Sequence, residues 1–428
     1  MFKTIVNAFK VKEIRNKILI TFGLLLIYRL GCWLPVPGIN VSAFSESIGG
    51  QDFLSLLSSV SGGALANGAI LALGISPYIS ASIIIQLLTI AIPSLERLSK
   101  MGEEGKKKIS AYTKICALIL AIVQAVAIVV SYKSALNTLT FPTWMVGTMV
   151  VLILVAGSMF TYWLGDKITA LGIGNGLSLL IFVGILSTAA SSMYSVIVNI
   201  FKGSTESIWE LVLFLVALVF IFGFIVFIDL GERRIPVQYA KQIKGRKMYG
   251  GQNTNIPIRV NATGVMPIIF ASSIISFPQL LCSIFWPNSK FYAWYSQWLG
   301  TGSWIYILLT GLLITFFAYF WTQITFNPED ISKSIQQNGG FILGIRPGKP
   351  TADYLKKISN RITLFGAIFL AIIAIVPSMI FKALSFTGGL VSVFSATGLL
   401  IVVSVAVELD KALDSQLIMR NYRGFLNK

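Results

Sequence analysis

The chain has 428 residues, of which 55% are hydrophobic and only 12% are charged. Soluble domains carry roughly 25% charged residues, so these charges are too few to cover the surfaces of the two or three soluble domains that this length allows. The sequence therefore predicts a protein whose surface lies mainly in lipid. Its net charge of +17 indicates an anionic partner, either nucleic acid or phospholipid head groups.

Two residue types that often carry chemistry are scarce. The chain has no histidine, which removes the commonest metal ligand and proton shuttle. Its three cysteines, Cys32, Cys116 and Cys282, form no C-x-x-C pair, and their odd number argues against a disulfide framework. We expect three buried, inert thiols and no cofactor.

Apolar runs long enough to cross a bilayer recur along the whole chain. A bilayer core about 30 Å thick needs about 20 apolar residues in a helix. The first run lacks a small-x-small cleavage site, so we expect a retained anchor rather than a signal peptide. In chain order, the ten predicted spans are 18–36, 68–92, 115–132, 144–164, 173–197, 209–228, 262–286, 303–325, 362–381 and 390–408.

The basic residues predict how these spans are oriented. If the N-terminal segment 1–17 is cytoplasmic, 29 of the 34 Lys and Arg residues lie on that side of the membrane. The inner face then has a net charge near +16 and the outer face one near +1. Because cytoplasmic loops are enriched in Lys and Arg, we expect both termini to be cytoplasmic.

Two of the predicted cytoplasmic loops, 229–261 and 327–361, exceed 30 residues, and a third basic loop spans 94–114. Loops of that length usually carry function or disorder. The glycine turns at Gly250-Gly251 and Gly339-Gly340 are typical of folded protrusions. The residues leave two interpretations open: the basic charges only orient the protein, or they form a docking surface for a cytoplasmic partner.

One apolar segment, 52–67, does not fit the span pattern. It is too short to cross the membrane and is broken by Gly62 and Gly63. Such a segment beside a span is either a re-entrant half-helix or a helix lying on the membrane surface. The residues alone do not decide between the two.

The spans also lack features that other membrane proteins need. Ion-coupled transporters keep charged residues near the middle of their spans, and all ten predicted spans have none there. An intramembrane enzyme would need a carboxylate pair, a Ser/His pair or metal ligands at that depth. A P-loop is missing too, since Gly348-Lys349 is followed by Pro350. Any work driven by ATP therefore requires another protein.

Three prolines, Pro77, Pro267 and Pro278, fall within the predicted spans 68–92 and 262–286. Proline inside a helix removes a hydrogen bond and produces a kink, so we expect kinks at all three positions. Polar residues cluster around them, either as contacts between helices or along a water-filled path. Two such spans at corresponding places in a chain of five plus five also suggest an inverted repeat.

Several stretches, in order along the chain, are similar to motifs of a known family. They are Tyr28–Gly31 with Pro35–Ile39, Ala72–Leu88, Gly172–Ile181, Arg233–Ala240 running on to Val265–Ser273, Phe326–Asp330 with Gly344–Thr351, and Met419–Phe425. On these residues the sequence resembles the SecY/Sec61-alpha family of protein-translocation channels. It departs from the family at Leu343, where a proline is usual, and at the acidic pair Glu408 and Asp410.

The resemblance implies an all-α polytopic membrane protein with ten transmembrane helices in two inverted halves around an hourglass pore. The halves would be 18–197 and 198–408, between a cytoplasmic segment 1–17 and a cytoplasmic tail 409–428. Segment 52–67 would be a re-entrant plug helix. Its sealing residues would be Leu56, Leu57, Gly62, Gly63, Ala64 and Leu65.

The resemblance also assigns roles to individual residues. The aliphatic pore ring would consist of Ile75, Ile79, Leu177, Ile181, Ile269 and Ile401. A lateral gate, held shut by modest polar contacts, would involve Ser80, Ser82, Gln86, Ser273 and Phe277. The docking residues on the cytoplasmic loops would be Arg233, Arg234, Arg246, Lys247, Arg346 and Lys349, with Arg346 coupling the motor.

The implied function is a protein-conducting channel in the plasma (inner) membrane of a bacterium. It would pass unfolded, signal-bearing polypeptides across the phospholipid bilayer and release membrane segments sideways into lipid, without catalysing bond chemistry. Its partners would be SecE-like and SecG-like small membrane subunits, the SecA ATPase motor and the ribosome. The alternative function is a secondary transporter of a small solute.

Overall fold

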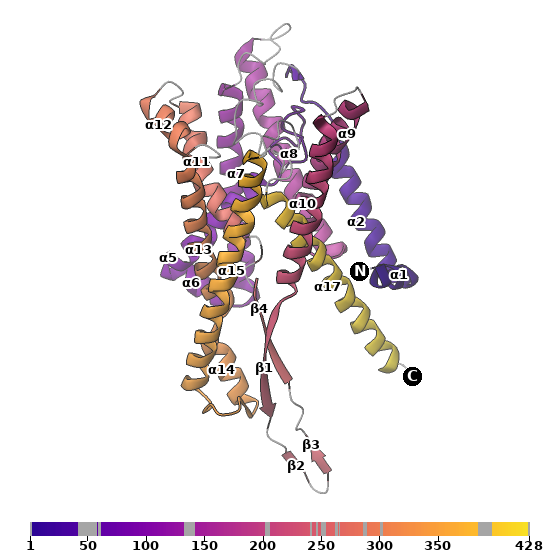
Figure 1. The fold of residues 1–428 in the computed structure, drawn as a ribbon, viewed down its shortest axis with the longest axis vertical. Helices are drawn as coiled ribbons and strands as arrows, with labels where there is room; N and C mark the ends of the chain where they lie inside the picture. The colour runs from indigo at the N-terminus through magenta and orange to yellow at the C-terminus, as the bar shows by residue number, and fades with distance from the viewer. Residues whose placement is uncertain are drawn as a thin grey trace.

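The protein is a bundle of long helices, with a small sheet and a short helix projecting from one end (Figure 1). The computed structural model describes residues 2–41, 58, 61–131, 142–201, 206–239, 242–244, 247–249, 254–261, 264, 266–285, 289–299, 303–383 and 396–426. The statements below concern these residues.

Each of the ten predicted spans overlaps a helix. These helices are α2 (Lys12–Gly31), α5 (Ser76–Ala91), α7 (Glu103–Ser131), α8 (Thr143–Leu171), α9 (Gly176–Phe201), α10 (Glu206–Asp229), α11 (Met266–Phe285), α13 (Trp304–Thr325), α15 (Lys349–Ala383) and α17 (Ala396–Leu426). Four shorter helices complete the described part: α1 (Phe2–Lys10), α6 (Pro93–Lys100), α12 (Lys290–Leu299) and α14 (Pro328–Gln337).

Length and composition support fewer spans than ten. In the described ranges, five segments are long and apolar enough to cross a membrane: Glu103–Val130, Thr143–Leu171, Gly176–Ser195, Trp304–Gln337 and Lys349–Val376. A sixth results if the bent pair α5 and α6 forms one span. With 16 residues, α5 rises about 24 Å, less than the bilayer core of about 30 Å.

Two of the three prolines predicted to kink a helix lie instead in the first turn of one. Residues 68–75 form turns, so α5 begins only at Ser76 and Pro77 lies in its first turn. Pro267 is likewise the second residue of α11, while Pro278 lies inside that helix. First-turn N–H groups have no partner within a helix, so proline is accommodated there and the kinks predicted at 77 and 267 are wrong. The sharp bend of 102° lies instead between α5 and α6, where Pro93 begins the second helix.

The two long loops are folded, as predicted, but they contain β-strands. In the first loop, β1 (Glu232–Tyr239) pairs antiparallel with β4 (Thr254–Arg259), and β2 (Gln242–Lys244) pairs with β3 (Lys247–Tyr249). The prediction of an all-α protein therefore holds for the bundle and not for this projection.

The second loop joins the first. Its strand β5 (Gly340–Phe341) pairs with β1, which gives a three-stranded sheet in the order β4-β1-β5. The apolar side chains of both loops share a buried core with the start of α15: Ile235, Val237, Ile258, Ile335, Ile342 and Leu355. The loops predicted as separate protrusions are thus one unit, which we call the projecting domain.

The buried core of the bundle falls into three main clusters. One is formed by the first half of the chain: Val36, Leu65, Ala72, Leu73, Ala125, Ile128, Val146, Val150 and Leu154. A second is formed by the second half: Ile225, Ile268, Ala271, Ile314, Phe369, Leu370, Ile373, Leu400, Val403 and Val407. The third draws on both halves, because α17 packs against α2, α9 and the turns before α5.

The ends of the chain lie toward the projecting domain, while α12 lies at the opposite end of the bundle (Figure 1). The first and last helices pack together through Ala8 on α1 and Leu413 on α17, with Ile14 and Ile173 beside them.

Candidate functional site

The third cluster lies where α2, α9, α17 and the turns before α5 meet, and we call it the central cluster. Three predicted ring residues, Ile75, Ile181 and Ile401, are buried members of it, with exposed fractions of 4%, 9% and 6%. The other three, Ile79, Leu177 and Ile269, are partly buried and pack against it. The structure therefore brings all six predicted residues together. The other buried members are Tyr28, Cys32, Ala64, Ala69, Leu71, Leu164, Ile168, Leu179, Leu180, Ile185 and Val405.

Local structure explains how the paired ring residues keep their spacing. Ile75 is the residue before α5, and its carbonyl oxygen accepts the first-turn hydrogen bond from the N–H of Ile79 at 3.0 Å. On α9, the side chain of Asn175 caps the helix by accepting from the N–H of Leu177 at 3.1 Å. Residues four apart on a helix share one face, so each pair presents its side chains together.

The central cluster is suited to closing a path without binding what passes through it. Branched alkyl groups offer no ligand to an ion, and a narrow apolar constriction excludes water. Burying each such side chain stabilises the closed packing by about 1.5–3 kcal/mol. Among the described side chains of the whole chain, no Asp, Glu, Lys or Arg is buried.

The predicted plug is described at residue 58 and from residue 61 onward, so Leu56 and Leu57 lie outside the described residues. Gly62 and Gly63 have φ angles of +72° and +81°, which glycine adopts readily. Ala64 belongs to the central cluster and Leu65 to the cluster of the first half, with exposed fractions of 0% and 1%. This segment is thus packed inside the bundle.

Side chains in the last turn of α2 and directly after it hold residues 61 and 62 in this position. The guanidinium Nη1 of Arg29 donates a hydrogen bond to the carbonyl oxygen of Gly62 at 2.7 Å. The hydroxyl of Tyr28 and the thiol of Cys32 donate to the carbonyl oxygen of Ser61 at 3.4 and 3.7 Å. The sequence analysis assigned Arg29 no contact with this segment. The signal that identifies Arg29 is two further donors, Tyr28 and Cys32, at one and three residues from the charge.

The predicted gate helices, α5 and α11, meet through apolar side chains. Ile83 of α5 and Phe270 of α11 are buried in one cluster with Phe317 of α13, and Ile79, Leu87 and Ile269 pack against it. The aromatic ring of Phe270 makes edge contacts with Phe317 and Trp321, with centroid distances of 5.5 and 5.4 Å. We call this contact the α5–α11 seam. The sequence motif did not single out Ile83 or Phe270.

The polar residues predicted for the gate lie on the same two helices. The side-chain amide of Gln86 donates to the hydroxyl of Ser82 at 3.3 Å, a contact within α5. Ser80 and Ser273 are half-buried. Phe277 lies on α11, and its side chain is outside the described part.

The predicted docking residues lie on the projecting domain. Arg233 and Arg234 are exposed on β1, where Arg234 pairs with Glu232 at 2.7 Å. Lys247 lies on β3, and Arg246 lies outside the described residues. Arg346 is exposed in the turn between β5 and α15, and Lys349 is the first residue of α15.

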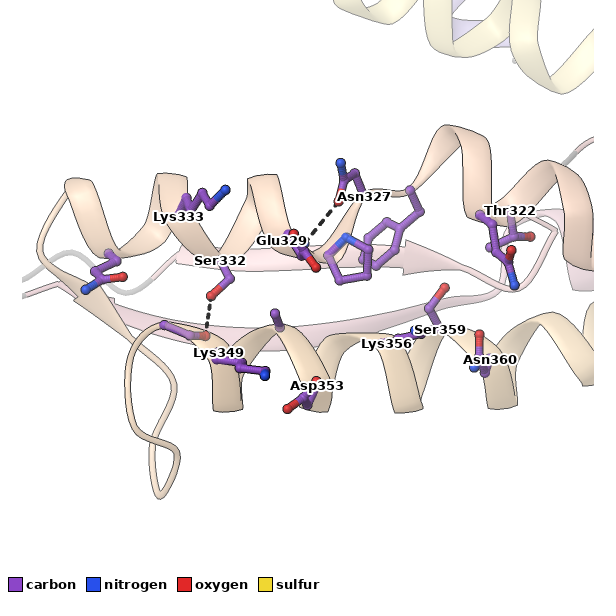
Figure 2. A pocket seen from close by; sticks show the side chains of 16 residues that line it. Thr322, Asn327, Glu329, Ser332, Lys333, Lys349, Asp353, Lys356, Ser359 and Asn360 are labelled. Atoms are coloured by element: carbon purple, nitrogen blue, oxygen red, sulfur yellow. Dashed lines mark hydrogen bonds between the residues drawn. The ribbon is translucent and has the colours of Figure 1, made fainter. Parts of the chain in front are cut away.

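Hydrogen bonds fix the turn that carries Arg346. The hydroxyl of Thr351 donates to the carbonyl oxygen of Arg346 at 2.8 Å. The hydroxyl of Ser332 on α14 donates to the carbonyl oxygen of Gly348 at 2.7 Å (Figure 2). The turn is therefore held against α14, and the Arg346 side chain is presented on a rigid support.

A groove of about 550 Å³ lies between α14 and the start of α15, beside this turn (Figure 2). Its charged lining has both signs: Glu329 and Asp353, with Lys333, Lys349 and Lys356. A groove of mixed charge fits a polar segment with complementary charges rather than an apolar one. The sequence analysis missed this groove because it arises only when α14 folds back on α15.

The chain is similar in sequence to known proteins along its whole length. A model of the SecY family matches residues 69–409. The protein translocase subunit SecY of Streptomyces galbus is 40% identical over 441 residues and covers all of both chains. The corresponding subunit of Thermotoga maritima is 38% identical over 439 residues, covering all of this chain and 98% of its own.

Solved structures are similar at the level of the fold. One, described as a protein conducting channel, has a TM-score of 0.66 at 19% identity and covers 94% of this chain and 93% of its own. Another has a TM-score of 0.68 at 20% identity, with coverage of 94% and 92%. It is described as showing that the plug domain of the SecY protein stabilises the closed state of the channel and maintains a membrane seal. Sec61 in a canine ribosome–channel complex has a TM-score of 0.64 at 18% identity, with coverage of 94% and 93%.

Proposed function

The chain belongs to the SecY family, and from this premise we propose that it is the protein-conducting channel of a Sec translocase. Unfolded, signal-bearing polypeptides cross the plasma membrane through the central cluster, and membrane segments leave sideways into lipid. The observation that carries this proposal is the convergence of six aliphatic side chains from α5, α9, α11 and α17 on one packed cluster. Such a ring conforms to many different side chains because it makes no directional contacts.

In this proposal all ten helices that coincide with the predicted spans cross the membrane, in two inverted halves. The separate clusters of the first and second halves support this division, since each half has a core of its own. The central cluster draws on residues of both halves, and the halves part there when the channel opens. Both termini and the projecting domain are cytoplasmic, in accord with the distribution of basic residues.

The segment from 52 to 67 acts as the plug, and the α5–α11 seam as the lateral gate. Support for the plug comes from Ala64, which is buried in the central cluster together with Ile401. Cysteines placed at position 64 and on α17 should form a cross-link in the resting channel. The seam is made of a few apolar contacts, and an apolar signal segment can replace them at little cost, because each buried CH₂ contributes about 0.8 kcal/mol.

The projecting domain docks the machines that supply polypeptide, namely the SecA motor and the ribosome. Exposed Arg233, Arg234, Arg346 and Lys349 give it a basic surface, which suits an acidic protein face or ribosomal RNA. SecE-like and SecG-like subunits complete the channel within the membrane. This chain supplies the path, and its partners supply the energy.

Reconstitution tests the function. Vesicles are prepared with the full chain and a SecE-like subunit, and a SecA motor, ATP and a signal-bearing precursor are added outside. We expect the precursor to become protected from external protease only when both ATP and the chain are present. Equal protection in vesicles without the chain would refute the proposal. Transport of a small solute that competes with the precursor would favour the secondary transporter.

A further inference from the structure

The plug segment and the residues that follow it are attached to the bundle in different ways. Residues 68–74, directly after the segment, are held by backbone and buried contacts: the N–H of Val36 donates to the carbonyl of Gly68 at 2.8 Å, and the N–H of Ile70 donates to that of Leu34 at 2.9 Å. The hydroxyl of Ser158 on α8 donates to the carbonyl of Gly74 at 3.1 Å. These bonds make residues 68–74 a fixed part of the first half.

Residues 61 and 62, by contrast, are tied to α2 by side-chain donors. The three donors, Tyr28, Arg29 and Cys32, reach two consecutive carbonyl oxygens. The bond from Arg29 is the shortest of the three and the one that involves a formal charge. Charge-assisted hydrogen bonds are roughly twice as strong as neutral ones. Arg29 is therefore the main side-chain tether of this part of the segment.

The geometry around Gly62 leaves little room for another arrangement. A Cβ atom at this position would lie 2.9 Å from Nη1 of Arg29 and 3.0 Å from Cα of Gly184 on α9. The segment thus passes between the guanidinium and the helix that carries Leu177 and Ile181. The guanidinium is also held from its other side, since its Cζ lies 5.9 Å from the ring centroid of Trp33.

We propose that Arg29 is a positioning residue that latches the plug segment over the central cluster through Gly62. This inference rests on the proposed function. When a polypeptide enters the central cluster, the bond from Arg29 to Gly62 breaks and residues 61–66 swing away, while residues 68–74 stay in place. The latch is reversible because its main bond is a single charged hydrogen bond from a half-buried side chain. It sets how strong a signal must be to open the channel.

Removing the guanidinium should unlatch the channel. We expect the variant Arg29→Leu to raise the ion leak of reconstituted vesicles about 10- to 100-fold, the range that corresponds to one charged hydrogen bond. Arg29→Lys, which keeps the charge but has a single donor head, should leak less than Arg29→Leu. Arg15→Leu is the matched control, because Arg15 is an exposed residue near the other end of α2.

The degree to which the channel rejects precursors with defective signals, which we call signal stringency, distinguishes a latch from a merely structural role of Arg29. At equal amounts of inserted protein, Arg29→Leu should accept a precursor with a defective signal while normal uptake of an intact precursor is retained. A structural defect would lower uptake of both precursors. Unchanged leak and unchanged stringency in correctly inserted Arg29→Leu would overturn the proposal. If the wild-type chain takes up no precursor, the proposed function fails instead, and the leak assay still reports on the latch.

A second variant covers the case in which Arg29→Leu does not accumulate. Gly62→Ala keeps Arg29 but forces the segment away, because of the close contacts at Cβ and the φ of +72°. Its control is Gly23→Ala on α2, where a Cβ would meet nothing within 4 Å. We expect Gly62→Ala to leak and Gly23→Ala to match the wild type. Equal, wild-type leak in both variants would also overturn the proposal.

Discussion

Tyr239 of β1 lies opposite Gly340 of β5, which makes one sheet of two loops that are far apart in the sequence. The pairing has little room for a side chain at Gly340, where a Cβ would lie 2.9 Å from Cε1 of Tyr239 and 3.0 Å from Cγ2 of Ile335. This close approach therefore contributes to the projecting domain, beside the pairing of Gln238 with Phe341 and the core that the two loops share. Loss of the pairing between the loops should change the relative positions of the basic residues.

We predict that Gly340→Ala loosens the projecting domain and weakens motor binding. The extra methyl group must displace Tyr239 or Ile335, and overpacking of this kind typically costs about 1–3 kcal/mol. Limited proteolysis should cut the loops of the variant faster, and the SecA motor should bind vesicles less tightly. Gly223→Ala is the control, since a Cβ there meets nothing within 4 Å. Wild-type proteolysis and binding in Gly340→Ala would show that the pairing does not support docking.

Arg346→Glu should block motor-driven uptake while the protein still inserts normally. The residue is exposed on a turn that is fixed by hydrogen bonds from Ser332 and Thr351. Replacing its side chain should therefore leave the fold intact. Reversing one charge of a close interfacial pair costs several kcal/mol, and we expect at least a tenfold loss of ATP-dependent uptake. Lys333→Glu makes the same change of charge at an exposed position on α14. An equal loss in both variants would attribute the effect to net charge rather than to Arg346.

Ile401→Asn should loosen the seal of the central cluster. Ile401 is buried among aliphatic side chains, and truncating a buried Ile costs about 2–5 kcal/mol, to which the amide adds the cost of burial without a partner. We expect increased ion leak and uptake of precursors with poor signals. Ile418→Asn, on the same helix but 59% exposed, is the control. The ring assignment would be contradicted if Ile401→Asn leaked no more than Ile418→Asn.

Substitutions in the α5–α11 seam test whether apolar or polar contacts hold the gate shut. Ile83→Ala should ease opening, because Ile83 of α5 is buried in one apolar cluster with Phe270 of α11. Ser82→Ala should have little effect, because the hydrogen bond of Ser82 to Gln86 lies within α5. The measurement is the insertion of a membrane segment of marginal hydrophobicity. The opposite order of effects would mean that polar contacts hold the gate.

The sequence predicted the approximate position of the helices because the length of an apolar run can be read from the local sequence alone. Each of the ten runs overlaps a helix, and the six residues predicted for the ring lie in or against one cluster, while their role as a pore ring stays a prediction. The start of α5 was predicted too early, since the apolar residues 68–75 look the same in a turn as in a helix. Their turns are set by long-range bonds such as that from Ser158 to Gly74.

Tertiary contacts account for what the sequence analysis missed. The two-residue strand β5 has no recognisable pattern, and its pairing with β1 depends on the fold of both loops. The contact of Arg29 with Gly62 joins residues 33 positions apart, and an isolated charge near the end of a span has an ordinary role at the membrane surface. The groove between α14 and α15 forms only when Ser332 reaches Gly348.

Photo-crosslinking from the central cluster tests the path of the polypeptide most directly. A photoreactive residue is placed at position 401, and a precursor is arrested during uptake by a folded domain at its C-terminus. We predict cross-links to the arrested precursor that require ATP and an intact signal, and none from a probe at position 418 on the same helix. Cross-links from position 418 but not from position 401 would contradict passage through the central cluster.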